Sequence, residues 1–371
     1  MLESILSAPV PAPESYGART ITTFDPCRAA AGPGLRLSLV RERAAVFRDE
    51  LRASGMPALA RTVPLVSLPY PARFGFFRAA ASPAPFLVMT NRMVVVRYRD
   101  FDGQARVLLF DPTDADLAAN TPFFRALARK TPKVVERLYV RRYPTVLEHL
   151  ADLGIAPEAV DFLSFDHLHT QDVRRWLGTT RPAPDLDPDA PVAPAFPRAR
   201  LLVQRDELAL VAHMHPIQAP WYQPATFADL PARSIVTLDG DVMLGPGVAL
   251  LSTPGHSSGN HTLVLHTNEG VWAFSENVVA AECLTPEHSA IPGLARRAAA
   301  MGWEVVLNGN TLEATATQYD SAVLEKSVVD RSARDERFVQ FFPTSQLTAH
   351  PLAPGLTPTF CHDELRHGAQ T

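Results

Sequence analysis

The sequence predicts an α/β protein with its strands in two stacked layers, and three observations support this class. Short β-branched runs alternate with helical patterns along the chain, as in α/β folds. Two strand-rich halves flank residues 181–198, a segment with six prolines and no periodicity, which predicts an extended surface loop. With 371 residues the chain can bury a large core without disulfides.

The composition excludes several classes of protein. Hydrophobic residues make up 46% of the chain and charged residues 20%, so the chain is globular rather than disordered. The net charge of -4 gives no basis for general nucleic-acid binding, and we expect no nucleic-acid partner. The 34 prolines argue against a bundle of long helices.

The cysteines and the apolar segments bear on the setting of the protein. Cys27, Cys283 and Cys361 are too few and too widely spaced for a disulfide framework or a CxxC zinc site, so we expect a reducing, cytoplasmic setting. The chain has no apolar run of about 18 residues and no signal-peptide pattern at its start. We therefore expect no membrane partner.

Apolar spacing and turn residues predict the elements of the first half in order. Helical spacing predicts a helix over residues 36–60. Two β-branched runs with a break at Asn91-Arg92 predict two strands, and Asp102-Gly103 predicts a hairpin turn into a third. These strands are expected over residues 86–90, 93–98 and 106–110.

A helix, a strand and a polar loop follow. Pro144 and Gly154 bound a predicted helix over residues 144–153. Residues 160–165 predict a strand, and residues 166–172 predict a polar loop. Because α/β proteins build their sites on loops beyond the carboxyl ends of strands, this loop is a candidate site.

The second half has the same alternating texture. The apolar runs predict strands over residues 200–203, 234–238, 248–251, 262–266, 271–274 and 304–307, and helices over residues 206–213, 292–301 and 322–337. Residues 338–371 are expected to form a tail that covers the site or makes a dimer contact.

Histidines are the main candidates for chemistry. His167 and His169 follow a predicted strand, where alternate side chains can reach one ion; two exposed loop histidines are the alternative. His256 lies in the turn Thr253-Pro-Gly-His-Ser-Ser-Gly259 between two predicted strands, where the alternative is a solvent-facing side chain.

A second His-x-His pair, His213 and His215, lies at the end of a predicted helix, shortly before Trp221 and Tyr222. Residues i and i+2 of a helix do not share a face, and the pattern slightly favours a solvated helix end. The functional interpretation is that His213, His215 and Tyr222 line a substrate pocket.

The His-x-His loop, the Pro-Gly-His turn and the strands around them resemble the metallo-β-lactamase superfamily, and within it the lactonase-like metallohydrolases. The resemblance runs from about residue 86 to residue 310. It implies an αβ/βα four-layer sandwich of two mixed β-sheets flanked by helices. The expected organisation is an N-terminal extension with a helix over residues 1–62, a metallo-β-lactamase-like domain over residues 63–337, and the tail.

The sequence departs from the family at the ligands of the second metal ion. Gln171 and Asp172 stand where the family's first motif has Asp and His. Asn277 aligns with the family's bridging Asp, and Asn310 with its last His. Amides are weak ligands for zinc, whereas imidazoles and carboxylates are strong ones, so a normal dinuclear site is not expected.

The resemblance, with these departures, implies one metal position held by His167, His169 and His256. Three histidines with an open position are a catalytic zinc arrangement; we expect one zinc ion, with iron or a metal-free site as alternatives. Asp172 or Glu276 would complete the ligand shell or act as general base, and a rebuilt two-metal site with both is a further alternative. The substrate pocket would also contain Gln171, Asn277 and Asn310.

The expected activity is metal-dependent hydrolysis of a small ester or lactone-like substrate. A homodimer is one possible oligomeric state. The loss of four family ligands supports a second hypothesis, a non-catalytic relative that binds a ligand or partner in the same cleft. Redox chemistry at a non-haem iron is a third hypothesis.

Overall fold

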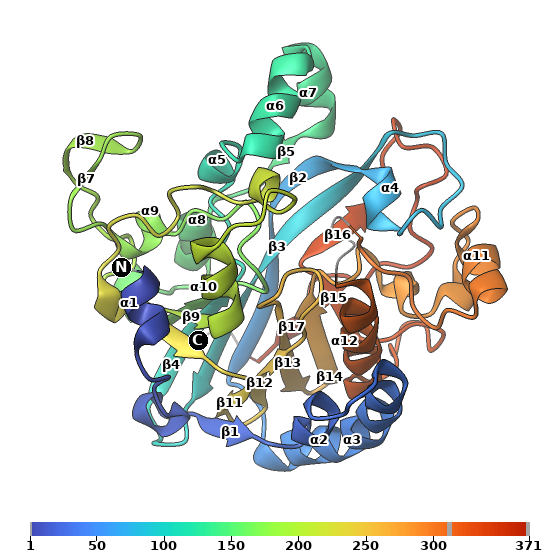
Figure 1. Cartoon of the computed structure of the whole chain (residues 1–371), viewed down its shortest axis with the longest axis horizontal. Coiled ribbons are helices and arrows are strands. Elements are labelled where there is room, and N and C mark those ends of the chain that lie inside the picture. The colour runs from blue at the N-terminus through green and yellow to red at the C-terminus, as the bar shows by residue number, and fades with distance from the viewer. Residues whose placement is uncertain (1, 310–313, 369–371) are drawn as a thin grey trace.

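Two mixed β-sheets packed face to face form the centre of the molecule (Figure 1). The computed structural model describes residues 2–309 and 314–368. The smaller sheet has the order β1-β11-β12-β13-β14-β15, with all pairs antiparallel except β14–β15. Its strands are β1 (Arg19–Ile21), β11 (Asp241–Gly245), β12 (Val248–Ser252), β13 (His261–Thr267), β14 (Gly270–Ser275) and β15 (Phe341–Pro343).

The larger sheet has the order β10-β9-β6-β4-β3-β2-β17, with β16 beside β3 and β5 beside β2. Neighbours from β10 to β4 are parallel, and the remaining pairs are antiparallel. Its strands are β2 (Leu59–Pro71), β3 (Phe86–Arg99), β4 (Ala105–Phe110), β5 (Arg141–Arg142), β6 (Phe162–Ser164), β9 (Arg200–Gln204), β10 (Ile235–Leu238), β16 (Ser345–Thr348) and β17 (Arg366–His367).

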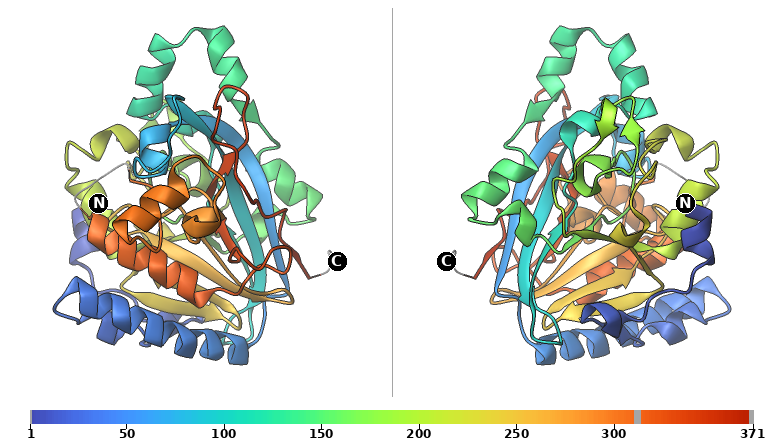
Figure 2. Two further views of the ribbon diagram at one scale, coloured as in Figure 1. Left: turned by 90° about the vertical axis from the view of Figure 1, so that its right-hand side faces the viewer. Right: turned by 90° about the vertical axis from the view of Figure 1, so that its left-hand side faces the viewer.

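Helices cover the outer faces of both sheets (Figures 1 and 2). The long helix α3 and α12 lie against the smaller sheet, while α8, α9 and α10 lie beside the larger one. The helices are α1 (Leu2–Ser7), α2 (Asp25–Arg28), α3 (Pro33–Ser54), α4 (Ala72–Gly75), α5 (Ala115–Ala118), α6 (Pro122–Lys130), α7 (Lys133–Tyr139), α8 (Val146–Asp152), α9 (Arg174–Leu177), α10 (Arg205–Ala212), α11 (Leu294–Met301) and α12 (Thr315–Val328). The predicted αβ/βα sandwich is confirmed.

Side-chain alternation explains the layering. In β12, Leu250 joins the core between the two sheets, whereas its neighbours Ala249 and Leu251 face the helix layer. In β4, Leu108 and Leu109 are divided in the same way. Because successive residues of a strand point to opposite faces, a continuous apolar run predicts a strand covered on both sides.

Several predicted elements are confirmed. The hairpin at Asp102-Gly103 joins β3 to β4. The helix expected over residues 144–153 is α8, where Thr145 and Glu148 form a capping box and Gly154 follows with φ +66°. These elements have local signals, a turn dipeptide or a pair of caps.

Four expectations about elements were wrong. Residues 86–98 form one strand, because Asn91 pairs with Val66 on one side and Ser345 on the other. The last long helix is α12, not residues 322–337. No strand is assigned to residues 304–307, where the backbone N–H of Val306 donates to Cys283 O (2.8 Å). The Pro-rich segment is not a bare loop, because it carries the small hairpin of β7 (Pro182–Ala183) and β8 (Asp187–Pro191).

The ends of the chain contribute to both sheets. Strand β1 pairs with β11, and the segment expected as a tail supplies β15 to one sheet and β16 and β17 to the other. Short 3-10 turns connect several elements, among them η3 (Ala219–Trp221) and η5 (Ala281–Cys283). None of the helices within residues 2–309 and 314–368 has the length and apolar character needed to cross a bilayer.

Candidate metal centre

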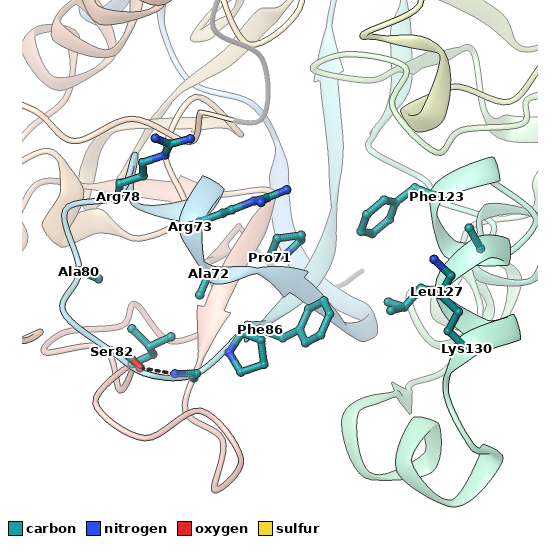
Figure 3. Close-up of a pocket in the computed structure, with 14 residues that line it drawn as sticks. Pro71, Ala72, Arg73, Arg78, Ala80, Ser82, Phe86, Phe123, Leu127 and Lys130 are labelled. Carbon is teal, nitrogen blue, oxygen red and sulfur yellow. Dashed lines mark hydrogen bonds between the residues drawn. The ribbon is translucent and has the colours of Figure 1, made fainter.

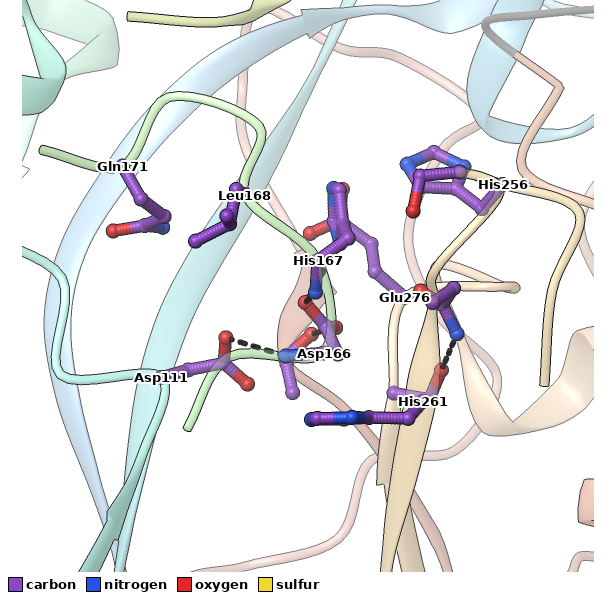
Figure 4. A network of polar contacts seen from close by, with 12 residues as sticks. Asp111, Asp166, His167, Leu168, Gln171, His256, His261 and Glu276 are labelled. Carbon is purple, nitrogen blue, oxygen red and sulfur yellow. Dashed lines mark hydrogen bonds and ion pairs between the residues drawn. The ribbon is translucent and has the colours of Figure 1, made fainter. Parts of the chain in front are cut away.

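Three histidines from two distant segments of the chain come together in the structure, and Figure 4 shows two of them, His167 and His256. His167 and His169 lie on the loop after β6, and His256 lies in the turn between β12 and β13. Each offers a ring nitrogen within 4.8 Å of the other two, and the ring centroids are 4.3, 4.6 and 5.1 Å apart. All three side chains are buried. The structure therefore brings the three predicted metal ligands together.

The imidazole of His167 is fixed by its neighbour Asp166. One carboxylate oxygen of Asp166 lies 2.7 Å from both the backbone nitrogen and Nδ1 of His167, and the other accepts from Thr344 Oγ1 (2.5 Å). Since Nδ1 donates to a carboxylate, Nε2 is the nitrogen for a ligand. Nε2 is buried and has no hydrogen-bond partner among the described residues, and a carboxylate behind a histidine is typical of metal sites.

The turn that carries His256 depends on a glycine. Gly255 has φ +138°, and a Cβ there would overlap the backbone of Gln318 in α12, so only glycine fits. His256 Nδ1 lies 3.2 Å from the backbone oxygen of Asn308. This hydrogen bond assigns the proton to Nδ1 and directs Nε2 toward the other imidazoles.

Glu207, at the start of α10, joins the two histidine loops. Its buried carboxylate accepts from the backbone N–H of Leu168 (2.8 Å), from Ser257 Oγ (2.6 Å) and from the N–H of Gly259 (3.2 Å). Tyr222 donates to it as well, at 2.9 Å. One side chain thus positions the segment between His167 and His169 and the segment after His256.

Burial and charge set the protonation of the three imidazoles. Burial lowers the pKa of His169 well below its usual value, and burial together with the charge of His167 lowers the pKa of His256 to about 3. Burial opposes the charged form of His167 too, but the adjacent Asp166 outweighs it and raises the pKa to about 9. Two neutral imidazoles are therefore ready to bind a metal, and the third must release a proton to do so.

A small cavity of about 50 Å³ opens beside the histidines. Glu276 lines this cavity with His167 and His169, and burial raises its pKa to about 7. Trp221 forms part of the wall, with its ring centroid 6.1 Å from that of His169. The predicted general base Glu276 thus lies beside the candidate metal position.

Asp172 lies in a different environment. Its carboxylate forms a buried ion pair with Arg174 (2.6 Å), which also pairs with Asp185. Asp172 is not part of the three-histidine group that could hold an ion. Gln171 lines the cavity and donates from Nε2 to Thr113 Oγ1 (2.9 Å).

The other predicted pocket residues are divided between core and surface. Asn277 is buried, and its Nδ2 donates to Thr253 O (3.2 Å) and to Glu325 Oε1 (2.8 Å). His213 and His215 are exposed at the end of α10, outside the cavity beside the metal position. Tyr222 packs edge-on against His169, with centroids 4.7 Å apart. Asn310 lies outside the described residues.

Sequence reasoning missed four residues that support the site. Asp166 had a signal, because it precedes the His-x-His pair and could have been read as its carboxylate partner. Glu207, Asn308 and Glu325 come from segments with no motif. Only the fold brings Glu207 and Asn308 to the histidine loops, and Glu325 to Thr262 and Asn277. Buried carboxylates such as Glu207 and Glu325 rarely occur without a partner.

The donor set fits one borderline metal ion. Three imidazoles with a neighbouring open cavity match catalytic zinc and also suit ferrous iron. The positions where the resemblance placed ligands of a second ion carry two amides, Gln171 and Asn277, and one carboxylate, Asp172, that is paired with Arg174.

Comparison with known proteins gives structural neighbours only. No family model and no curated protein matches the chain. A quorum-quenching N-acyl homoserine lactone lactonase is 17% identical, with 67% of this chain and 87% of that chain covered and a TM-score of 0.44. A probable metal-dependent hydrolase from Staphylococcus aureus is 12% identical over 73% of this chain and 83% of that chain, with a TM-score of 0.47.

A third structure is a dizinc quorum-quenching lactonase, AidC, at 12% identity over 62% of this chain and 76% of that chain, with a TM-score of 0.40. Two of these three structures are described as lactonases and one as a metal-dependent hydrolase, the same classes of protein that the sequence motifs resemble. At TM-scores below 0.5 they carry no weight on the activity of this chain, which has to be inferred from its own residues.

Proposed function

We propose that this protein is a metal-dependent hydrolase of esters or lactones with a mononuclear three-histidine centre. The proposal rests on one observation: three buried imidazoles, the first and last of them 89 positions apart in the sequence (256 minus 167), present ring nitrogens within 4.8 Å of one another. In two of these rings Nδ1 is hydrogen bonded to a protein oxygen, as is usual for histidines that bind a metal through the other ring nitrogen.

The residues around the centre have separate tasks. His167, His169 and His256 would hold a zinc ion, which would supply polarisation of a carbonyl oxygen and would lower the pKa of a coordinated water to about 7. Asp166 and Asn308 orient two of the imidazoles, and Glu207 holds both loops. Glu276 faces the same cavity and accepts a proton during the reaction. Asp172 is less suited to that task because Arg174 already neutralises it.

A second candidate function is ligand binding without catalysis. The observation in its favour is that the positions of the family's second ion are used for internal hydrogen bonds, as with Asn277 and Glu325. Such a protein would keep the fold and the cavity but would hold no ion.

Metal content and turnover, measured together, separate the two functions. Protein purified without chelator should contain about one equivalent of zinc or iron and should hydrolyse members of a panel of aryl esters and lactones. His169→Ala should lose both the ion and the activity, whereas His213→Ala, at an exposed histidine, should keep both. Less than about a tenth of an equivalent in the wild type would favour binding without catalysis, and full activity in His169→Ala would refute the proposed centre.

A further inference from the structure

The helical hairpin α6–α7 projects from the sandwich (Figures 1 and 2), and its sequence is strongly basic. Its two helices carry five cations and a single carboxylate, Glu136, although the whole chain has a net charge of -4. Within the described residues none of these cations forms an ion pair with a neighbouring carboxylate. The five cations are Arg125, Arg129, Lys130, Lys133 and Arg137.

The outer face of α7 exposes apolar side chains between these cations. Val134 is 68% exposed and Leu138 is 56% exposed. They are four residues apart and so share one face of the helix, with Lys133 and Arg137 beside them at the same spacing. An apolar stripe flanked by basic residues is the pattern of helices that lie in the interface of an anionic membrane.

The inner face of the hairpin covers an apolar chamber of about 270 Å³. Leu127 and Tyr139 from the hairpin face Leu68 and Phe86 of the larger sheet across this chamber. The chamber also adjoins the cavity beside the histidines, since one set of residues lines both spaces. These shared residues are Val66, Leu68, Ala118 and Phe124.

A groove of about 590 Å³ runs along the other side of α6, between this helix and α4 (Figure 3). Its apolar walls include Phe86 and Phe123. Arg73 lies on the α4 side and Lys130 on the α6 side, with Arg78 farther along, and no acidic residue is among the described residues that line it. The positive charge of the hairpin therefore continues along the adjacent rim.

We propose that the α6–α7 hairpin docks on an anionic lipid surface, and that the chamber beneath it receives the hydrocarbon chain of an ester held in that surface. The exposed apolar side chains and the unpaired cations of the hairpin explain the docking. The residues that line both the chamber and the cavity give the hydrocarbon chain of the ester a route to the histidines. The docking needs neither a membrane-spanning helix nor a metal ion. Only the delivery of an ester rests on the proposed hydrolase function.

Vesicle sedimentation tests the docking on the full-length protein. The wild type should bind vesicles of phosphatidylcholine with about 30% phosphatidylglycerol at least tenfold more tightly than pure phosphatidylcholine vesicles, and the binding should weaken as salt is raised. The double variants Lys133→Glu with Arg137→Glu, and Val134→Ser with Leu138→Ser, should each bind at least about tenfold more weakly. Circular dichroism checks that both variants are folded.

Two controls make the test specific. Leu35→Ser with Met301→Ser changes side chains of similar exposure, 57% and 47%, on other helices, and should bind within about twofold of the wild type. His169→Ala should keep its vesicle binding, so that a failure of the hydrolase proposal leaves the docking result intact. Hydrolysis without vesicle binding would overturn the docking alone.

Three outcomes would overturn the proposal. The first is a wild type that stays in solution with anionic vesicles. The second is equal binding to neutral and anionic vesicles, or an equal loss in the Leu35 and Met301 control. The third is a wild type that forms a dimer and does not bind vesicles, together with a Val134→Ser, Leu138→Ser double variant that is monomeric in size-exclusion chromatography. The hairpin would then contact a second copy of the chain.

Discussion

The two halves of the candidate site differ in what their polar groups bind. In the histidine half, Asp166 and Asn308 hold the imidazoles of His167 and His256 from behind, and the opposite sides of the rings face one another. In the amide half, Asn277 donates to Glu325 and Gln171 to Thr113. The first arrangement directs ring nitrogens toward one another. The second uses its amide nitrogens for hydrogen bonds within the fold, although Asn277 Oδ1 and Glu325 Oε2 have no hydrogen-bond partner among the described residues.

This difference separates side chains that bond within the fold from side chains that could hold an ion. A buried carboxylate or imidazole without a metal is costly, whereas an amide can both donate and accept. Asn277 uses its amide to bond a carboxylate from α12 and a backbone oxygen. The amide half is therefore part of the core, and the histidine half remains a site.

The largest expected effect is at the anchor of the histidine half. Glu207→Ala leaves four buried donors without their acceptor, and should lower the free energy of unfolding of metal-free protein by about 4 kcal/mol. Urea denaturation measures this change. Glu42→Ala, at a side chain 66% exposed, is the control and should change it by less than about 0.5 kcal/mol. A loss below about 1 kcal/mol for Glu207→Ala would show that the loops do not depend on it.

The amide half should make stability depend on pH. Burial raises the pKa of Glu325 to about 7 from its usual 4.5, so the folded state favours the protonated acid. This contribution is complete below pH 4.5 and is lost as the pH rises through 7. Between pH 4.5 and pH 8, the free energy of unfolding of the wild type should therefore fall by about 3 kcal/mol relative to that of Glu325→Gln.

Denaturation at a series of pH values measures that loss. Glu287→Gln, at a side chain 57% exposed, should leave the wild-type pH profile unchanged. Parallel profiles for the wild type and Glu325→Gln would contradict the assignment of the pH dependence to this carboxyl group.

A carboxylate at position 277 should destabilise the amide half. Asn277→Asp removes the donor to Glu325 and places a second carboxylate beside it. This change should lower the free energy of unfolding by about 2 kcal/mol near neutral pH. Adding Glu325→Gln should recover most of this loss, because the like-charge contact is removed. Urea denaturation of the single and double variants measures the coupling, and additive effects would show that the two side chains act independently.

The last effect, on metal affinity and not on stability, is expected behind His167. Asp166→Asn keeps the shape of the side chain but weakens the hydrogen bond to Nδ1, and should lower metal affinity by about 10–100-fold. Competition with a chromogenic chelator measures the affinity. Asp172→Asn serves as the matched control, since Asp172 pairs with Arg174; an equal loss in that variant would mean that both carboxylates support the ion.

Local patterns predicted much of the fold and the ligands of the site. The hairpin at Asp102-Gly103 and the capped helix after Pro144 were confirmed because their signals lie within a few residues. The broken strand at Asn91 was wrongly predicted because its continuity depends on pairing with Ser345, 254 positions later (345 minus 91). The helix expected to start at residue 322 begins at Thr315, since buried polar residues blurred its pattern.

By itself the sequence determined the alternation of strands and helices and the order of the two histidine motifs, and it placed the amides Gln171 and Asn277 where carboxylates of a second ligand set were expected. Only the tertiary structure decided that Glu207 would hold both motifs, that Glu325 would face Asn277, and that a basic hairpin would stand over an apolar chamber. Periodicity and turn chemistry act between neighbours along the chain. The partner of a buried charge is instead chosen by which distant segments the sheets bring together.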